Sequence, residues 1–124
     1  HYNYVMEPIP GVYNDGACAD LARRSLSRTL GEEAVVPSGP WMASESLAVY
    51  HTLYRGVLAF LGIRDGAGCG APHHSAEFDL DPQGLTLGTA ATVSYALDFL
   101  ADSFTPPPRK PTAGVLERLK KQLL

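Results

Sequence analysis

Apolar residues gather in stretches along the chain, and the most apolar of these is residues 56–63, GVLAFLGI. Its apolar side chains follow one another without alternating with polar ones. A continuous apolar run of this length is typical of a strand that is covered on both faces, as in a central or parallel strand of an α/β sheet. The pattern therefore predicts a buried strand at residues 57–63.

Two longer stretches have the apolar spacing of helices. The first follows a turn at residues 14–16, which supplies an N-cap, and it stops at Gly31. The second begins with Asp81 as its cap and Pro82 at its first position, and it ends at residues 102–103. Both pairs of boundaries are of the kinds that favour the ends of helices.

The second of these helices contains Gly84 and Gly88, which lower its intrinsic helix propensity. We therefore expect close packing against the sheet to hold it. Weaker patterns predict a strand at 2–6, a brief strand at 34–36, a Pro-rich linker at 106–111 and an amphipathic helix at 113–124. Strands and helices alternate, so the predicted fold class is α/β, with too few strands to form a covered sheet by itself.

Composition places the chain among ordinary globular domains. It has 124 residues, of which 45% are hydrophobic and 19% charged, enough for one modest core. The net charge of -3 gives no electrostatic reason to expect a nucleic acid or an anionic membrane as partner. No apolar run is long enough to span a bilayer. The two cysteines, Cys18 and Cys69, form no CxxC pair and are too few for a disulfide framework, so a reducing cytoplasm is expected. Cys18 is expected to be a small buried hydrophobe.

The loop between the predicted strand and the second long helix carries His73 and His74. In α/β sheets, ligands bind beyond the carboxyl ends of the strands. Neutral imidazole is a good ligand for zinc, manganese or cobalt. Adjacent side chains in an extended loop point to opposite sides, so at most one of the two rings is expected to face a given metal. A catalytic zinc needs about three protein ligands, and the local candidates for the others are Glu77, Asp79 and Asp81.

Other interpretations of these residues remain open. The glycines at 66–70 lack the ending of a phosphate-binding loop, so a flexible loop beside a substrate cleft is the better interpretation. Cys69 could act as a nucleophile with His74 as its base, or the histidines could be ordinary loop residues. Ser44 and Glu45 fit either a helix cap, where Glu45 complements the helix dipole, or a functional role.

Four segments in the chain resemble a family of metal-dependent amidohydrolases, the aminoacylase/carboxypeptidase family that includes hippurate hydrolases. They occur in the order PGVYND at 10–15, MASESL at 42–47, LAFLGI at 58–63 and PHHSAEFDLD at 72–81. No one of these motifs is decisive, but four at compatible spacing make the resemblance fairly specific. It extends over residues 2–100.

The resemblance implies roles for particular residues. His74 matches the last metal-ligating histidine of the family, whereas His73 replaces an apolar neighbour and inherits no role. Ser44 and Glu45 match the turn that lines the substrate cleft. The remaining ligands, and the glutamate that serves as general base, are expected upstream of this chain, so no catalytic residue is expected within it.

The fold that the resemblance implies is a partial three-layer αβα catalytic domain of the phosphorylase/hydrolase-like zinc-peptidase type, with an incomplete sheet and flanking helices. Residues 1–10 would be the last strand of an inserted lid or dimerisation domain and its exit turn. Residues 11–104 would be the carboxyl-terminal part of the catalytic domain, and residues 105–124 a Pro-rich linker and a C-terminal helix.

The implied activity is hydrolysis of an amide bond in an N-acyl-amino acid or a small peptide. Two divalent metal ions, zinc with manganese or cobalt as alternatives, would activate a water and polarise the carbonyl. The remainder of the same domain, or another chain, would cover the strand at 57–63, and a homo-oligomer is expected. The 124 residues alone are predicted to be inactive. The alternative function is a truncated or diverged non-catalytic α/β domain with an interaction or structural role.

Overall fold

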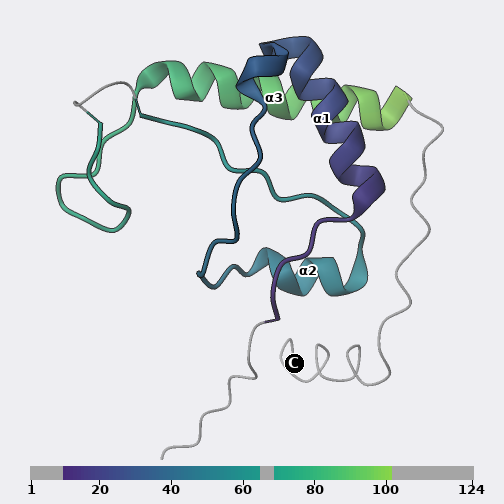
Figure 1. Cartoon of the computed structure of the whole chain (residues 1–124), viewed down its shortest axis with the longest axis horizontal. Helices are drawn as coiled ribbons and strands as arrows, with labels where there is room; N and C mark the ends of the chain where they lie inside the picture. The colour runs from purple at the N-terminus through teal and green to yellow at the C-terminus, as the bar shows by residue number, and fades with distance from the viewer. Residues whose placement is uncertain (1–9, 65–68, 102–124) are drawn as a thin grey trace, which may run out of the picture. The chain divides into compact units, whose positions relative to one another are not determined.

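The computed structural model describes residues 10–64 and 69–101 (Figure 1). In chain order, these residues form the helices α1 (Gly16–Leu30), η1 (Glu32–Ala34, a 3-10 helix), α2 (Leu47–Leu53) and α3 (Pro82–Ala101). They fall into two compact units, residues 10–19 with 39–58, and residues 20–38 with 59–64 and 69–101. None of these helices is long and apolar enough to cross a membrane.

The boundaries of the two long helices are confirmed where the structure describes them. Helix α1 ends at Leu30, and Gly31 follows it with a φ of 97°, a left-handed conformation that glycine adopts without steric cost. Helix α3 begins at Pro82, and the carboxylate of Asp81 accepts a hydrogen bond from the backbone N–H of Gln83 at 2.9 Å. Both ends therefore form for the local reasons that the sequence indicates.

The predicted α/β fold is wrong, because no strand or sheet occurs in residues 10–64 and 69–101 and a three-layer αβα domain requires one. A strand exists only through hydrogen bonds to a neighbouring strand. In residues 57–63 the carbonyl and N–H of Leu58 bond instead to the side chain of Asn14, at 2.9 and 2.8 Å. The carbonyl of Ile63 accepts the N–H of Asp81 at 2.9 Å. The segment is apolar as a strand would be, but it pairs with no strand in the described part of the chain.

The predicted brief strand at residues 34–36 is wrong for a more local reason. The Val35 N–H donates to the carbonyl oxygen of Glu32 at 3.2 Å and so closes the 3-10 helix η1. The backbone angles of Val35 are extended, with φ −105° and ψ 96°. The N–H that a strand would offer to a neighbour is therefore used within the turn.

Close packing at the two glycines of α3 is confirmed, although the neighbour is the unpaired segment rather than a sheet. A Cβ added at Gly84 would lie 3.3 Å from Cγ2 and 3.5 Å from Cα of Ile63. A Cβ added at Gly88 would lie 2.7 Å from Cδ2 of Leu61. The glycines thus allow residues 61–63 to lie directly against the helix backbone.

The rest of α3 is apolar but largely uncovered. The helix contains a single charged residue, Asp98. Leu85, Leu97 and Leu100 are 60%, 62% and 80% exposed. A helix with so few polar residues is normally buried on most of its surface.

Several predicted elements lie outside the described residues. These are the strand at 2–6, the Pro-rich linker at 106–111 and the helix at 113–124.

The two glycines of α3 allow a matched test of the packing. Replacing glycine by alanine in a helix gains about 1 kcal/mol of intrinsic propensity. At Gly88 the new methyl meets the end of the flexible, partly exposed Leu61 side chain, which can move. At Gly84 it meets a β-branched side chain and backbone of Ile63, which cannot move easily. We therefore expect Gly88→Ala to raise the free energy of unfolding, measured in urea. The free energy of unfolding of Gly84→Ala should be about 1 kcal/mol lower than that of Gly88→Ala. Equal stabilisation by both would contradict this packing.

Candidate functional site

The candidate metal ligand His74 lies in a turn that spans residues 73–77. The Ser75 N–H donates to the carbonyl of Pro72 at 3.3 Å, and the Phe78 N–H donates to the carbonyl of Ser75 at 3.3 Å. Within the described residues, His74 alone among non-glycine residues has a positive φ, of 66°. Such a left-handed conformation costs most residues about 1 kcal/mol, although histidine is among those that adopt it most often. The turn therefore holds this histidine in an unfavourable backbone conformation.

The two adjacent histidines have different surroundings. The His73 ring contacts the Phe78 ring, with centroids 5.2 Å apart and ring planes inclined by 30°. The His74 ring is exposed, and its centroid is 6.5 Å from that of His73. No hydrogen bond engages the His74 imidazole within the described part of the chain. Of the two rings, that of His73 has the closer aromatic neighbour, and that of His74 is exposed without a hydrogen bond in the described part of the chain.

The local carboxylates do not assemble around His74. Asp79 accepts a hydrogen bond from the N–H of Leu80 at 2.8 Å, and Asp81 caps α3. Glu77 is exposed. Across residues 10–64 and 69–101, no group of three histidine, cysteine or acidic side chains is placed to hold a metal ion. The described residues therefore assemble no complete metal centre around His74.

The alternative pair of Cys69 and His74 has no hydrogen bond to support it in the described residues. Cys69 is a free thiol and is half-buried. The other cysteine, Cys18, is fully buried in α1, as the sequence pattern predicts.

The candidate substrate residues Ser44 and Glu45 belong to the first compact unit, whereas His74 belongs to the second. Glu45 acts at the start of α2, where its Oε1 accepts a hydrogen bond from the N–H of Leu47 at 3.1 Å. The N-cap position is held by Ser46, whose side chain makes no capping bond. Ser44 is therefore not the N-cap; its exposed hydroxyl makes no hydrogen bond within the described residues. A substrate role for Ser44 stays a prediction.

Asp15 starts helix α1. Its Oδ1 accepts hydrogen bonds from the N–H groups of Ala17 at 3.1 Å and Cys18 at 3.2 Å, as an N-cap does. Its Oδ2 accepts a hydrogen bond from Arg55 at 2.6 Å, and its own N–H donates to the Gly56 carbonyl at 2.9 Å. Burial acts to raise the pKa of Asp15, but the hydrogen bonds and the positive charge of Arg55 outweigh it and lower the pKa overall. Together with Asn14, this aspartate gives the ND pair of the motif at 10–15 a structural role.

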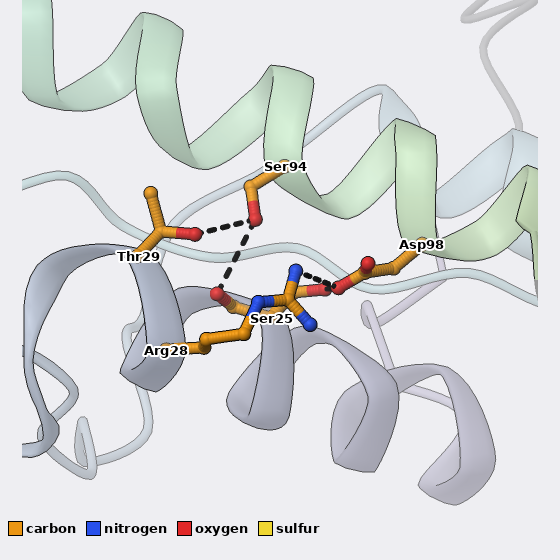
Figure 2. Close-up of polar contacts among 5 residues, drawn as sticks. All are labelled: Ser25, Arg28, Thr29, Ser94 and Asp98. Carbon is orange, nitrogen blue, oxygen red and sulfur yellow. Dashed lines mark hydrogen bonds and ion pairs between the residues drawn. The ribbon is translucent and has the colours of Figure 1, made fainter.

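A second polar cluster, which the periodic patterns of the sequence do not predict, is formed by α1 and α3. Figure 2 shows Ser25, Arg28 and Thr29 on α1 facing Ser94 and Asp98 on α3. One carboxylate oxygen of Asp98 accepts hydrogen bonds from the Ser25 hydroxyl and from Arg28, the latter at 2.6 Å. The hydroxyls of Thr29 and Ser94 are 2.6 Å apart, and the Ser94 hydroxyl also donates to the carbonyl of Ser25. The hydrogen bonds of this cluster hold the largely apolar α3 against α1.

Two sequence signals could have revealed this cluster. Asp98 is the one charged residue of α3, and Ser25 is a polar residue on the apolar face of α1. Arg28, although 64% exposed, pairs with Asp98 at 2.6 Å. The hydrogen bonds from Ser25 and then from Arg28 lower the pKa of Asp98 most. Burial opposes them, and the charges of Arg28 and Arg24 add smaller lowering effects.

Comparison with known proteins gives one general indication. No protein-family model and no solved structure matches the chain. The chain is similar to a protein of Arabidopsis thaliana described as "IAA-amino acid hydrolase ILR1-like 2", with 27% identity over 96 residues, which is 77% of this chain. The similar region covers 22% of that protein, so the chain spans only about a fifth of its length. The chain is thus distantly similar to a hydrolase, the general class that the sequence motifs indicate.

The lowered pKa of Asp98 makes stability depend on pH. A carboxyl whose pKa is lower in the folded state stabilises the fold fully above its ordinary pKa of 3.8, and this contribution is lost as the pH falls below that value. We expect Asp98→Asn to lower the free energy of unfolding at pH 7 and to reduce its decrease between pH 5 and pH 3. Urea denaturation at pH 7, pH 5 and pH 3 measures this.

Asp20 provides the matched control for Asp98. It pairs with Arg23 at 3.0 Å, and both side chains are about two-thirds exposed. Because an exposed pair of this kind contributes little, we expect Asp20→Asn to change the free energy of unfolding at pH 7 less than Asp98→Asn does. An equal effect of the two substitutions would show that the cluster between α1 and α3 adds nothing to stability.

Proposed function

We propose that this chain is part of a metal-dependent amidohydrolase, in which His74 binds a divalent metal ion and water cleaves an amide bond to an amino acid. The observation that carries the proposal is the conformation of His74, an exposed imidazole on a left-handed backbone within a hydrogen-bonded turn. The distant similarity to an amino acid hydrolase supports the general class.

The backbone of His74 favours a functional role over a structural one. Unfavourable backbone conformations cluster at active sites and ligand-binding positions, where the side chain is needed at that place. Glycine or asparagine would fit a left-handed position more easily. The His74 ring also makes no hydrogen bond in the described part of the chain that would repay the strain. A ligand for the imidazole would account for a histidine here.

The chemistry of His74 fits a zinc, manganese or cobalt ion, which all accept neutral imidazole. The described residues supply one such ligand, so the other ligands of the proposed centre come from parts of the protein outside residues 10–64 and 69–101. When bound, such a metal would lower the pKa of a coordinated water and polarise the substrate carbonyl. His74 itself would orient the site and would move no proton.

The proposed substrate is an N-acyl-amino acid or a small peptide. Ser44, with its exposed hydroxyl, is the proposed hydrogen-bonding residue for the substrate. Glu45 follows Ser44 in the sequence. One of its carboxylate oxygens accepts a hydrogen bond from the N–H of Leu47, and this bond fixes the Glu45 side chain. The proposed role of Glu45 is therefore to hold the turn before α2 in shape for the substrate.

A further part of the proposal concerns the apolar segment at residues 57–63. Phe60 is 54% exposed and Leu61 is 44% exposed, so the described residues cover them incompletely. Apolar surface of this kind favours contact with more protein. We propose that the remainder of the same protein covers this segment.

The role of His74 is tested in the full-length protein by measuring bound zinc and the hydrolysis of N-acetyl-amino acids. We expect His74→Asn, which keeps a residue that tolerates the left-handed backbone, to lose bound metal and to lose more activity than the roughly 10–100-fold typical of residues that only orient a ligand. Residues 1–124 alone should show no metal-dependent hydrolysis.

The control for His74→Asn is Glu77→Gln, which changes an exposed side chain of the same turn. We expect this variant to keep both metal and activity. If His74→Asn retains full metal content and turnover, His74 is not a ligand and the proposed function fails.

A further inference from the structure

His73 occupies a position for which the sequence motifs give no function. In the structure its ring lies against Phe78, five residues further along the chain, with ring centroids 5.2 Å apart. The ring planes are tilted by 30° to each other, and the centroid distance lies within the range of about 4.5–7 Å over which aromatic rings attract one another. The contact joins the two ends of the turn that contains His74.

The backbone hydrogen bonds of this turn are long. Both are 3.3 Å between nitrogen and oxygen, beyond the usual range for strong N–H···O bonds of about 2.7–3.2 Å. By themselves, these two hydrogen bonds restrain His74 only weakly, and the left-handed conformation of His74 is unfavourable. An unfavourable backbone conformation persists only where the surroundings hold it firmly. The ring contact between His73 and Phe78 is the side-chain interaction that closes the same turn.

We propose that His73 is a positioning residue for His74: through its ring contact with Phe78 it closes the turn and keeps His74 in the left-handed conformation with its imidazole exposed. The metal-related consequence of this inference rests on the function proposed above, whereas the effect on the turn does not. The role requires a flat or bulky side chain at position 73 that can cover Phe78, and it does not require the basicity of histidine.

The conservative substitution His73→Phe therefore separates the ring contact from ligation. We expect His73→Phe to keep a ring contact with Phe78, and His73→Ser to lose it. The first readout is NMR of the full-length protein labelled at histidine, in which the Hα–HN coupling and Cα shift of His74 report its φ. We expect the wild-type values in His73→Phe and a shift toward extended φ values in His73→Ser.

The second readout is the dissociation constant for Zn²⁺ in the same proteins. Residues that orient a metal ligand typically contribute 10–100-fold to metal affinity. We expect His73→Ser to weaken Zn²⁺ binding about 10-fold and His73→Phe to change it less than twofold. Phe78→Ala should weaken binding as His73→Ser does, and the double variant should lose no more than either single variant, because both act through one contact.

The outcomes distinguish this inference from the function on which its second part rests. If His73→Ser leaves the φ of His74 unchanged, the inference is overturned. If His73→Phe weakens Zn²⁺ binding as much as His73→Ser does, His73 acts through its own nitrogen and the positioning role is also overturned. If wild-type protein binds no Zn²⁺ while His73→Ser still changes the φ of His74, the positioning role stands and the proposed metal function fails.

Discussion

The backbone of residues 56–63 must satisfy its hydrogen bonds without a neighbouring strand in the described part of the chain, and this constraint shapes what surrounds it. Buried or half-buried carbonyl and N–H groups need partners. Asn14 supplies both a donor and an acceptor to Leu58, much as a neighbouring strand would, and the N–H of Asp15 meets the carbonyl of Gly56. At the other end of the segment, Ile63 accepts from Asp81. The residues that begin α1 and α3 are thus the same ones that hold this segment.

The apolar character of α3 adds a second constraint. With Asp98 as its one charged residue, the helix has a single charged side chain with which to fix its rotation against α1. Ser25 and Arg28 both donate to the same oxygen of the Asp98 carboxylate, which fixes the orientation of that side chain. The contact does so although the side chains of Arg28 and Asp98 are partly exposed. The glycines on an adjacent strip of the helix admit residues 61–63. Polar pairing and close packing together orient the helix, and its remaining leucines stay available for contact with more protein.

Features that depend on neighbours in the sequence could be predicted, and those that depend on distant residues could not. The glycine after α1, the cap and proline before α3 and the buried Cys18 are local consequences of residue type. The sheet was predicted from the apolarity of residues 57–63, but apolarity shows only that a segment needs covering, not what covers it. The pairing of Ser25 with Asp98 spans 73 positions, beyond any periodic pattern. In the candidate site, the sequence predicts a role for His74 but does not predict the ring contact between His73 and Phe78.

The turn around His74 shows why a site can be visible in a sequence while its supports are not. A metal-binding residue type is recognisable by its chemistry, because few side chains provide a neutral nitrogen ligand. The residues that hold it can be of many types, since a stacked ring or a bulky aliphatic group would close the turn equally well. A support therefore carries no fixed signature and becomes identifiable only when a contact such as that between His73 and Phe78 is seen. The left-handed backbone of His74 connects the candidate ligand with its supporting residues. A strained residue is retained where its side chain has a function, and it persists only where neighbouring residues hold its conformation.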